Sequence, residues 1–260
     1  LIADLDSIPF PRRELSLDHA LYRTEEACAI ITSRACPYHC TFCASHTLWG
    51  HKVRYRSIPN ILEEIKYLVS LYEKPLLLFA DDAFTLSPMR VKELCARLLS
   101  DDVDVIWQCM TRINFVQDEI TQYMRKAGCR LVYMGVESGS DRILRRINKR
   151  IRIEQCKRAG TILERNGVAW GSFFMIGFPD ETVEDMQRTE EAVRELRAFQ
   201  TTLSIFTPLP GTELYEECRQ RGLISPEPDW RVFDPYAPEV SVAVQVPVEE
   251  FRVIVSRMFT

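Results

Sequence analysis

Three cysteines crowd into eight residues near the start of the chain. Cys36, Cys40 and Cys43 stand in the segment ACPYHCTFC. Soft thiolates at this spacing can surround one metal centre, because a short loop can direct all three sulfurs to the same side. Three cysteines without an evident fourth favour an iron–sulfur cubane with one open iron. An open iron can bind a substrate or a cofactor, so this pattern predicts chemistry rather than simple electron storage.

A zinc site is the main alternative for these cysteines. Structural zinc takes four protein ligands, and His39, His46 or His51 would have to supply the fourth. Zinc modules are usually small and built on paired cysteine knuckles, whereas this trio follows the first strand of a predicted large sheet. The zinc interpretation leads to a non-catalytic, metal-stabilised binding module, for example one that binds RNA.

Six short apolar, β-branched runs alternate with helical patterns. They predict strands at Cys28–Thr32, Leu76–Ala80, Val103–Gln108, Leu131–Val136, Val168–Ile176 and Thr201–Phe206. Both faces of these runs are apolar, which is typical of a parallel sheet covered on both sides. Six strand–helix units are too few for a closed eight-stranded barrel. The predicted fold is α/β, an open (β/α)6 partial TIM barrel with a parallel sheet, and a doubly wound flat sheet is the alternative.

Capping residues mark several helix boundaries. Ser57 is expected to cap a helix at its start, and Thr182 with Asp185 forms the pattern of a capping box with a shorter acid. Gly128 and Gly167 stand where two helices should end. In either candidate fold, the loops after the carboxyl ends of the strands form the functional site.

The cysteine motif resembles the signature of the radical S-adenosylmethionine (radical SAM) superfamily, with aromatic Phe42 before the last cysteine. The resemblance covers about residues 27–215 and implies a 4Fe-4S cluster on Cys36, Cys40 and Cys43. In this family the open iron chelates the methionine end of S-adenosylmethionine (SAM), and one electron yields a 5′-deoxyadenosyl radical. The protein positions and insulates the cofactor. Phe42 is therefore counted among the cofactor-binding residues.

The resemblance assigns cofactor roles to two residues after the second and third strands. Asp82 takes the acid's place in a Gly-Gly-Glu motif that holds the SAM ammonium group, although Ala80 and Asp81 replace both glycines. A carboxylate at the end of a strand is well placed for a cation, and a turn cap is the competing interpretation. Arg112 is expected to pair with the methionine carboxylate, and a structural salt bridge is its alternative.

The segment GVESGS at 135–140 is similar to a motif of methylthiotransferases and cobalamin-dependent radical enzymes. Glu137 is expected to accept hydrogen bonds from the ribose hydroxyls, and Ser138 is counted as a cofactor-binding residue beside it. A helix-capping turn is the alternative for this segment. Lys149 matches a basic residue that helps to bind the cofactor in relatives. Met175 is placed by the resemblance against the adenine. The alternative for Lys149 is a solvated surface position, and the alternative for Met175 is a place in the apolar core.

Domain boundaries follow from the same comparison. Residues 1–25 are expected to be a linker, 26–225 the radical SAM core, and 226–260 a truncated C-terminal extension. The opening LDSIPFPR looks like the connector from an N-terminal cobalamin-binding domain outside this chain. The resemblance thus implies cobalamin as a further cofactor and predicts a cobalamin-dependent methyltransferase or a related cyclase. Methylthio transfer is the alternative, weakened because no second cysteine trio is visible.

Composition narrows the class of protein. With 46% apolar and 27% charged residues and a net charge of −4, the chain has the character of an ordinary globular protein, and nucleic acid is not indicated as a partner. No apolar run is long enough for a membrane span. Nine cysteines, an odd number, favour a reducing cytoplasm. The expected partners are a small-molecule or peptide substrate and an external electron donor of the flavodoxin or ferredoxin type.

Overall fold

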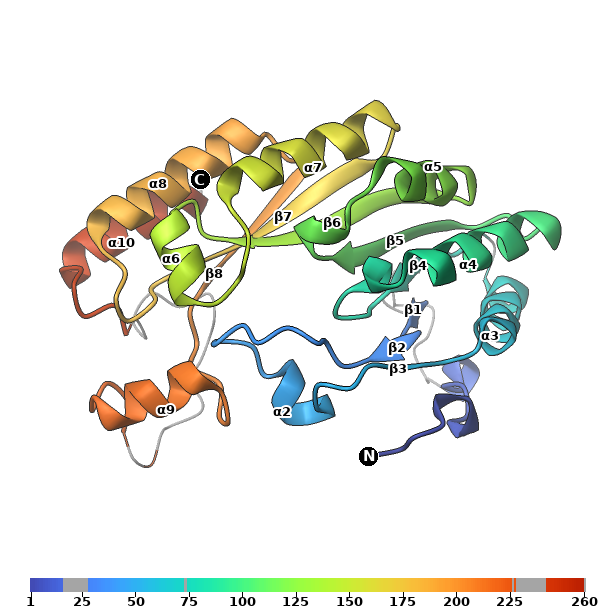
Figure 1. Cartoon of the computed structure of the whole chain (residues 1–260), viewed down its shortest axis with the longest axis horizontal. Coiled ribbons are helices and arrows are strands. Elements are labelled where there is room, and N and C mark those ends of the chain that lie inside the picture. The colour runs from blue at the N-terminus through green and yellow to red at the C-terminus, as the bar shows by residue number, and fades with distance from the viewer. Residues whose placement is uncertain (16–27, 73, 226, 228–241, 260) are drawn as a thin grey trace. The chain divides into compact units, whose positions relative to one another are not determined.

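The computed structural model describes residues 1–15, 28–72, 74–225, 227 and 242–259. Six strands form one sheet in the order β1-β4-β5-β6-β7-β8, and Figure 1 shows them alternating with helices. The paired strands run parallel. Their order follows the chain without the reversal that defines a doubly wound sheet. The α/β fold with a six-stranded parallel sheet is therefore confirmed, and the doubly wound alternative is wrong.

Every predicted strand has a counterpart in the structure. The sheet consists of β1 (Ala29–Ile30), β4 (Leu76–Phe79), β5 (Ile106–Thr111), β6 (Cys129–Glu137), β7 (Ala169–Ile176) and β8 (Gln200–Ile205). A separate antiparallel ribbon, which was not predicted, pairs β2 (Ser33–Arg34) with β3 (Arg54–Tyr55). The helices are α2 (Ser45–Trp49), α3 (Ile58–Leu71), α4 (Pro88–Ser100), α5 (Asp118–Lys126), α6 (Asp141–Arg146), α7 (Ile153–Arg165), α8 (Val183–Leu196), α9 (Glu213–Gln220) and α10 (Val248–Phe259). Among the described helices, none has both the length and the apolarity to cross a bilayer.

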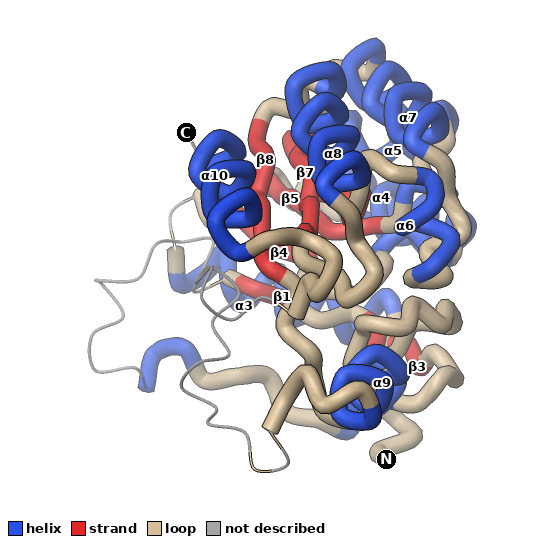
Figure 2. Tube along the Cα trace, turned by 90° about the vertical axis from the view of Figure 1, so that its left-hand side faces the viewer, coloured by secondary structure: helices blue, strands red, loops and turns tan. Residues whose placement is uncertain are grey.

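The chain divides into two compact units. Unit 1 comprises Leu1–Pro37, Trp49–Met134 and Thr161–Trp170; unit 2 comprises Tyr38–Leu48, Gly135–Gly160 and Gly171–Thr260. In unit 2, α8 and α10 lie side by side (Figure 2). The predicted linker at 1–25 and the predicted extension at 226–260 fall partly outside the described residues, so the domain boundaries stay predictions.

One face of the strands is much more buried than the other. In unit 1 the fully buried side chains of β4 and β5 are Leu77, Phe79, Trp107 and Cys109, each 0% exposed. The side chains that alternate with them, such as Leu78 and Met110, are only partly buried. In unit 2, Phe174 and Ile176 of β7 are buried, whereas Phe173 and Met175 are partly exposed. The two faces are therefore buried to different degrees, because the helices of a partial barrel form an outer layer.

The predicted helix caps are confirmed. The Ser57 side chain accepts a hydrogen bond from the backbone N–H of Asn60 at the start of α3. Thr182 and Asp185 form a complete capping box at the start of α8. Gly128 and Gly167 follow α5 and α7 with φ of 101° and 68°, a left-handed conformation that favours glycine.

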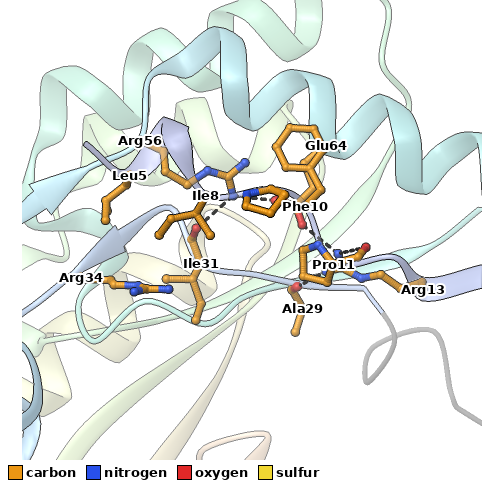
Figure 3. A pocket seen from close by; sticks show the side chains of 11 residues that line it. Leu5, Ile8, Phe10, Pro11, Arg13, Ala29, Ile31, Arg34, Arg56 and Glu64 are labelled. Carbon is orange, nitrogen blue, oxygen red and sulfur yellow. Dashed lines mark hydrogen bonds and ion pairs between the residues drawn. The ribbon is translucent and has the colours of Figure 1, made fainter. Parts of the chain in front are cut away.

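Within unit 1, the segment of residues 5–13 is held against β1 and α3 by a buried ion group. Its residues line a hollow of about 150 Å³ together with β1 and α3 (Figure 3). The Glu64 carboxylate accepts hydrogen bonds from Arg13 at 3.0 Å and from Arg56 at 2.5 Å, and all three side chains are at most 10% exposed. The Arg56 guanidinium also stacks on Phe10, 5.3 Å from the ring centroid. Removal of Glu64 would leave two buried guanidinium groups without their carboxylate, so this ion group holds the segment in place.

Candidate functional site

The cysteine segment starts directly after β2 and lies within the loop that the β2–β3 ribbon closes. Ala35 takes a positive φ of 84°, which turns the chain just before Cys36. The backbone N–H of Cys43 donates to the carbonyl of Cys40 at 3.1 Å, so these two cysteines share one turn. Cys40 is buried, and Cys36 and Cys43 are partly exposed.

Within unit 2, the cysteine turn is attached to two helices. The N–H of Thr41 donates to the carbonyl of Ile147 at the end of α6, and the carbonyl of Thr41 accepts from the N–H of Leu214 in α9, both at 3.1 Å. The Asn148 side-chain amide donates to the carbonyl of His39 at 2.7 Å. Three hydrogen bonds around Cys40 therefore fix the backbone from which its thiol projects.

Asn148 offers a direct test of this attachment. Its φ of 52° is tolerated by asparagine and by glycine, so Asn148→Gly removes the amide without adding backbone strain. We expect the loss of about 1 kcal/mol of hydrogen bonding, seen as a several-fold faster loss of iron to a chelator from the reconstituted protein. Arg197→Gly, at another left-handed position (φ 48°), is the matched control and should leave the rate unchanged. Equal rates in all three proteins would contradict the attachment.

Phe42 joins an aromatic group in unit 2. Its ring meets that of Phe178 edge to face, with centroids 6.0 Å apart, and Phe178 lies 5.1 Å from Phe206. Phe178 follows β7, and Phe206 follows β8. The residue between Cys40 and Cys43 thus packs on the loops after the last two strands.

Glu181 supports these aromatic contacts, and sequence reasoning missed it. Its Oε2 accepts hydrogen bonds from the N–H groups of Gly177 at 2.5 Å and Phe178 at 3.1 Å. Its Oε1 is buried without a hydrogen-bond partner among the described residues. Burial raises the pKa of Glu181 to about 8, against the lowering effect of the two N–H donors. The acid four residues after Gly177 was a visible signal, but only the fold shows its burial.

Two of the predicted cofactor residues, Glu137 and Lys149, contact each other. The Lys149 Nζ lies 2.6 Å from the Glu137 Oε1, and both side chains are nearly buried. A side chain at Gly135 would displace this pair, because its Cβ would lie 2.4 Å from that oxygen. Glu137 also holds a left-handed φ of 72°, which is costly for a residue with a side chain. Such strain occurs at functional sites, so it supports a role for Glu137 beyond packing.

Ser138 is fully buried, and its hydroxyl forms hydrogen bonds with other residues of unit 2. It exchanges a hydrogen bond with Thr189 of α8 at 3.2 Å and accepts one from the N–H of Ser140 at 3.1 Å. Ser140 in turn donates to Asp185 at 2.6 Å. These contacts give Ser138 a structural task, and its cofactor role stays a prediction.

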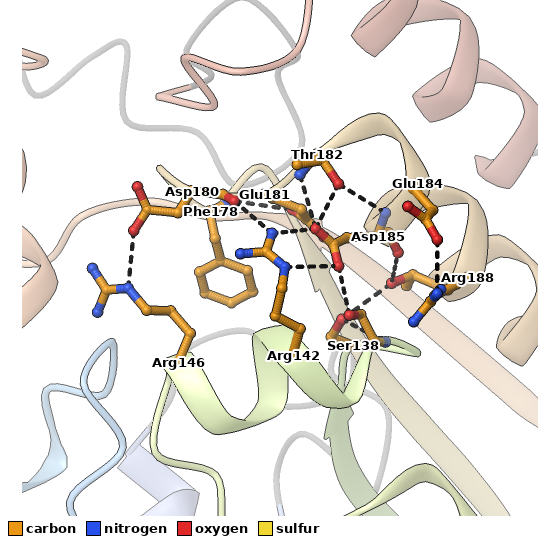
Figure 4. A network of polar contacts seen from close by, with 12 residues as sticks. Ser138, Arg142, Arg146, Phe178, Asp180, Glu181, Thr182, Glu184, Asp185 and Arg188 are labelled. Carbon is orange, nitrogen blue, oxygen red and sulfur yellow. Dashed lines mark hydrogen bonds and ion pairs between the residues drawn. The ribbon is translucent and has the colours of Figure 1, made fainter.

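Two arginines of α6 reach the loop before α8 (Figure 4). Arg142 pairs with Asp185, and Arg146 pairs with Asp180 at 2.9 Å and also with Glu217 of α9. Burial opposes the ionisation of Asp185, but hydrogen bonds from Arg142, Ser140 and Thr182 outweigh it and hold its pKa well below the usual range. These ion pairs position α6, whose end carries the cysteine turn.

The two aspartates after β4 have different environments in unit 1. Asp82 is exposed. Asp81 is 1% exposed and accepts hydrogen bonds from the N–H and hydroxyl of Thr32, at 3.2 and 2.9 Å, and from the Ser33 hydroxyl. Burial raises the pKa of Asp81, although these hydrogen bonds favour its ionised form. Asp81, which sequence reasoning did not assign, thus fixes the strand that leads to Cys36, while Asp82 is accessible to a ligand.

The remaining predicted residues occupy the ends and faces of strands. Arg112 directly follows β5 in unit 1 and is 5% exposed. Met175 lies on the more open face of β7 in unit 2, so it is not part of the buried core formed by Phe174 and Ile176. Within the described ranges, the structure contains no preformed group of three His, Cys, Asp or Glu side chains for a metal ion. The assignment of ligands therefore depends on the cysteine motif and on the family.

Comparison with known proteins decides the family. Residues 30–193, more than half of the chain, match the model of the Radical SAM superfamily. The chain belongs to this superfamily. The resemblance inferred from the cysteine motif is thereby confirmed.

Relatives of this radical SAM chain include proteins of two reaction types. It is 33% identical to the uncharacterized methyltransferase PH0819 of Pyrococcus horikoshii, over 86% of this chain and 49% of that protein. It is 30% identical to the anaerobic magnesium-protoporphyrin IX monomethyl ester cyclase of Rubrivivax gelatinosus, over 71% of this chain and 34% of that enzyme. The chain thus spans at most about half the length of these relatives.

A solved structure supports the fold. The radical SAM methyltransferase TsrM of Kitasatospora setae, determined with cobalamin and a [4Fe-4S] cluster, superimposes with a TM-score of 0.68 at 20% identity. The match covers 74% of this chain and 36% of TsrM. At this level of identity the likeness establishes the partial-barrel fold.

Proposed function

We propose that the chain is the radical core of an enzyme that holds a 4Fe-4S cluster on Cys36, Cys40 and Cys43 and cleaves SAM reductively. The observation that carries this proposal is the cysteine motif in a chain of the radical SAM family. The donor set fits the group, because three soft thiolates ligate three irons and leave the fourth for SAM. When bound, the reduced cluster supplies the electron that splits the sulfonium to methionine and a 5′-deoxyadenosyl radical.

The chain's own residues position the cofactor in this proposal. In unit 1, exposed Asp82 binds the ammonium group of SAM, and Arg112 pairs with its carboxylate. In unit 2, Glu137 accepts hydrogen bonds from the ribose, oriented by its ion pair with Lys149. Met175 contacts the adenine from the open face of β7. The aromatic contact between Phe42 and Phe178 supports the cysteine turn and limits the access of water.

For the complete protein, we favour methyl transfer that depends on cobalamin held by a domain outside this chain. The methyltransferase PH0819 and the cobalamin-bound methyltransferase TsrM support this choice. Ring closure is the second candidate, because the Rubrivivax relative is a cyclase. The proposed setting is the cytoplasm, with a small-molecule or peptide substrate and an external electron donor.

Anaerobic reconstitution tests the core of the proposal. The reconstituted chain should be brown, contain about four irons and release 5′-deoxyadenosine when given dithionite and SAM. Omission of either dithionite or SAM is the control and should give no product. A colourless protein with one tightly held zinc would refute the proposal and support the metal-stabilised binding module.

A further inference from the structure

An exposed basic patch lies between α6 and α7. Arg145, Arg150 and Arg152 line a hollow of about 250 Å³ together with Asp141, Ile151 and Gln155. All three arginines are exposed. The lining therefore carries three positive charges and one negative charge, in a chain whose net charge is −4.

Two of the three arginines of this basic patch, Arg145 and Arg152, keep a positive charge that no described acidic residue neutralises. The neighbouring cations form ion pairs outside the patch. Arg142 pairs with Asp185 of α8, and Lys149 pairs with Glu137. Arg146 pairs with Asp180, which precedes α8, and with Glu217 of α9. Arg145 and Arg152 form no ion pair with any residue in the described part of the chain. Clustered charges of one sign focus the local potential and attract a partner of opposite sign.

The basic patch is connected to the cysteine turn. Arg150 donates from Nε to the Asn148 side-chain oxygen at 3.0 Å, and the Asn148 amide donates to the carbonyl of His39 at 2.7 Å. His39 directly precedes Cys40 and is exposed. Two hydrogen bonds therefore connect the basic patch to the residue that precedes Cys40. Because electron transfer slows steeply with distance, a donor protein should dock near the cysteine turn.

We infer that the basic patch is the docking surface for an acidic one-electron donor protein of the flavodoxin or ferredoxin type. This inference rests on the proposed function, because it requires a cluster on the cysteines. The reduced donor gives up one electron to the cluster and leaves in its oxidised form, and SAM is the final acceptor. Charge complementarity directs association and fixes orientation, so binding weakens as salt rises.

The test compares a protein donor with a chemical one. The holoenzyme carries the double charge reversal Arg145→Glu and Arg152→Glu, which spares Arg150 because that residue contacts Asn148. With a reduced acidic flavodoxin at low salt, the KM for the donor should rise by ~10-fold or more. With dithionite, which needs no docking surface, the rate of 5′-deoxyadenosine release should stay within about twofold of the wild type, because these arginines contact no cofactor.

The matched control reverses two exposed cations of unit 1, Lys126→Glu and Arg130→Glu. Lys126 is the last residue of α5, and Arg145 lies in the last turn of α6. Both variants therefore replace a positive charge by a negative one at the C-terminal end of a helix. The control should behave as the wild type with both donors.

An unchanged KM for flavodoxin in the patch variant overturns the inference, and so does an equal loss of activity with both donors. Loss of RNA binding with unchanged flavodoxin kinetics would assign the patch to nucleic acid instead. A wild-type protein inactive with either donor would refute the proposed function itself.

Discussion

Replacement of Cys40 by alanine should reduce 5′-deoxyadenosine formation to background. Cys40 is the middle ligand of the motif and the most buried of the three cysteines, with 5% exposure. Two remaining thiolates leave two irons without protein ligands, so the cluster is not retained. The iron content after anaerobic reconstitution should fall from about four per chain to near zero. Iron analysis and product chromatography measure the two effects.

The fold should survive this substitution. The turn is held by backbone hydrogen bonds of Thr41 and by the contact of Asn148 with His39, none of which uses the Cys40 thiol. Cys95→Ala is the matched control, because Cys95 is buried in α4 and stands outside the motif. We expect the control to bind iron and form product as the wild type does. A Cys40 variant with a full complement of iron would contradict the ligand assignment.

The stability of the chain should depend on pH through Glu181. Its pKa is about 8 in the folded state, against an ordinary value of 4.5. Between these values the folded state keeps a proton that the unfolded state releases, so stability falls as pH rises. Burial is the main cause, repulsion by Asp185 adds to it, and Arg142 acts in the opposite direction. The free energy of unfolding contributed by Glu181 should fall by roughly 3 to 4 kcal/mol from pH 5 to pH 8.

Glu181→Gln isolates this contribution. The amide keeps an oxygen that can accept from Gly177 or Phe178 but does not titrate. In urea titrations at several pH values, the difference in unfolding free energy between the wild type and the variant should therefore decrease steadily toward pH 8. Glu184→Gln, at an exposed position in the first turn of the same helix, is the control and should leave the pH profile unchanged. Parallel profiles for the wild type and Glu181→Gln would show that the folded carboxyl is already ionised.

Sequence by itself determined the features that depend on near neighbours. The cysteine spacing indicated the family, because ligands within eight residues need little tertiary information to bind one centre. The capping box of Thr182 and Asp185 and the left-handed glycines were also predicted, because caps are formed within a few residues of the helix end. The strand–helix alternation gave the number of sheet strands, and the structure fixed their order.

Only the tertiary structure decided which polar groups meet. Asp81 binds Thr32 across 49 residues, and Asn148 binds His39 across 109. The sequence assigned Glu137 and Lys149 separately, yet they form one buried pair. The sequence also could not show that one face of the strands is less buried than the other, since apolar residues occupy both faces. Local patterns are set by covalent neighbours, whereas burial and pairing depend on which distant segments the folded chain brings together.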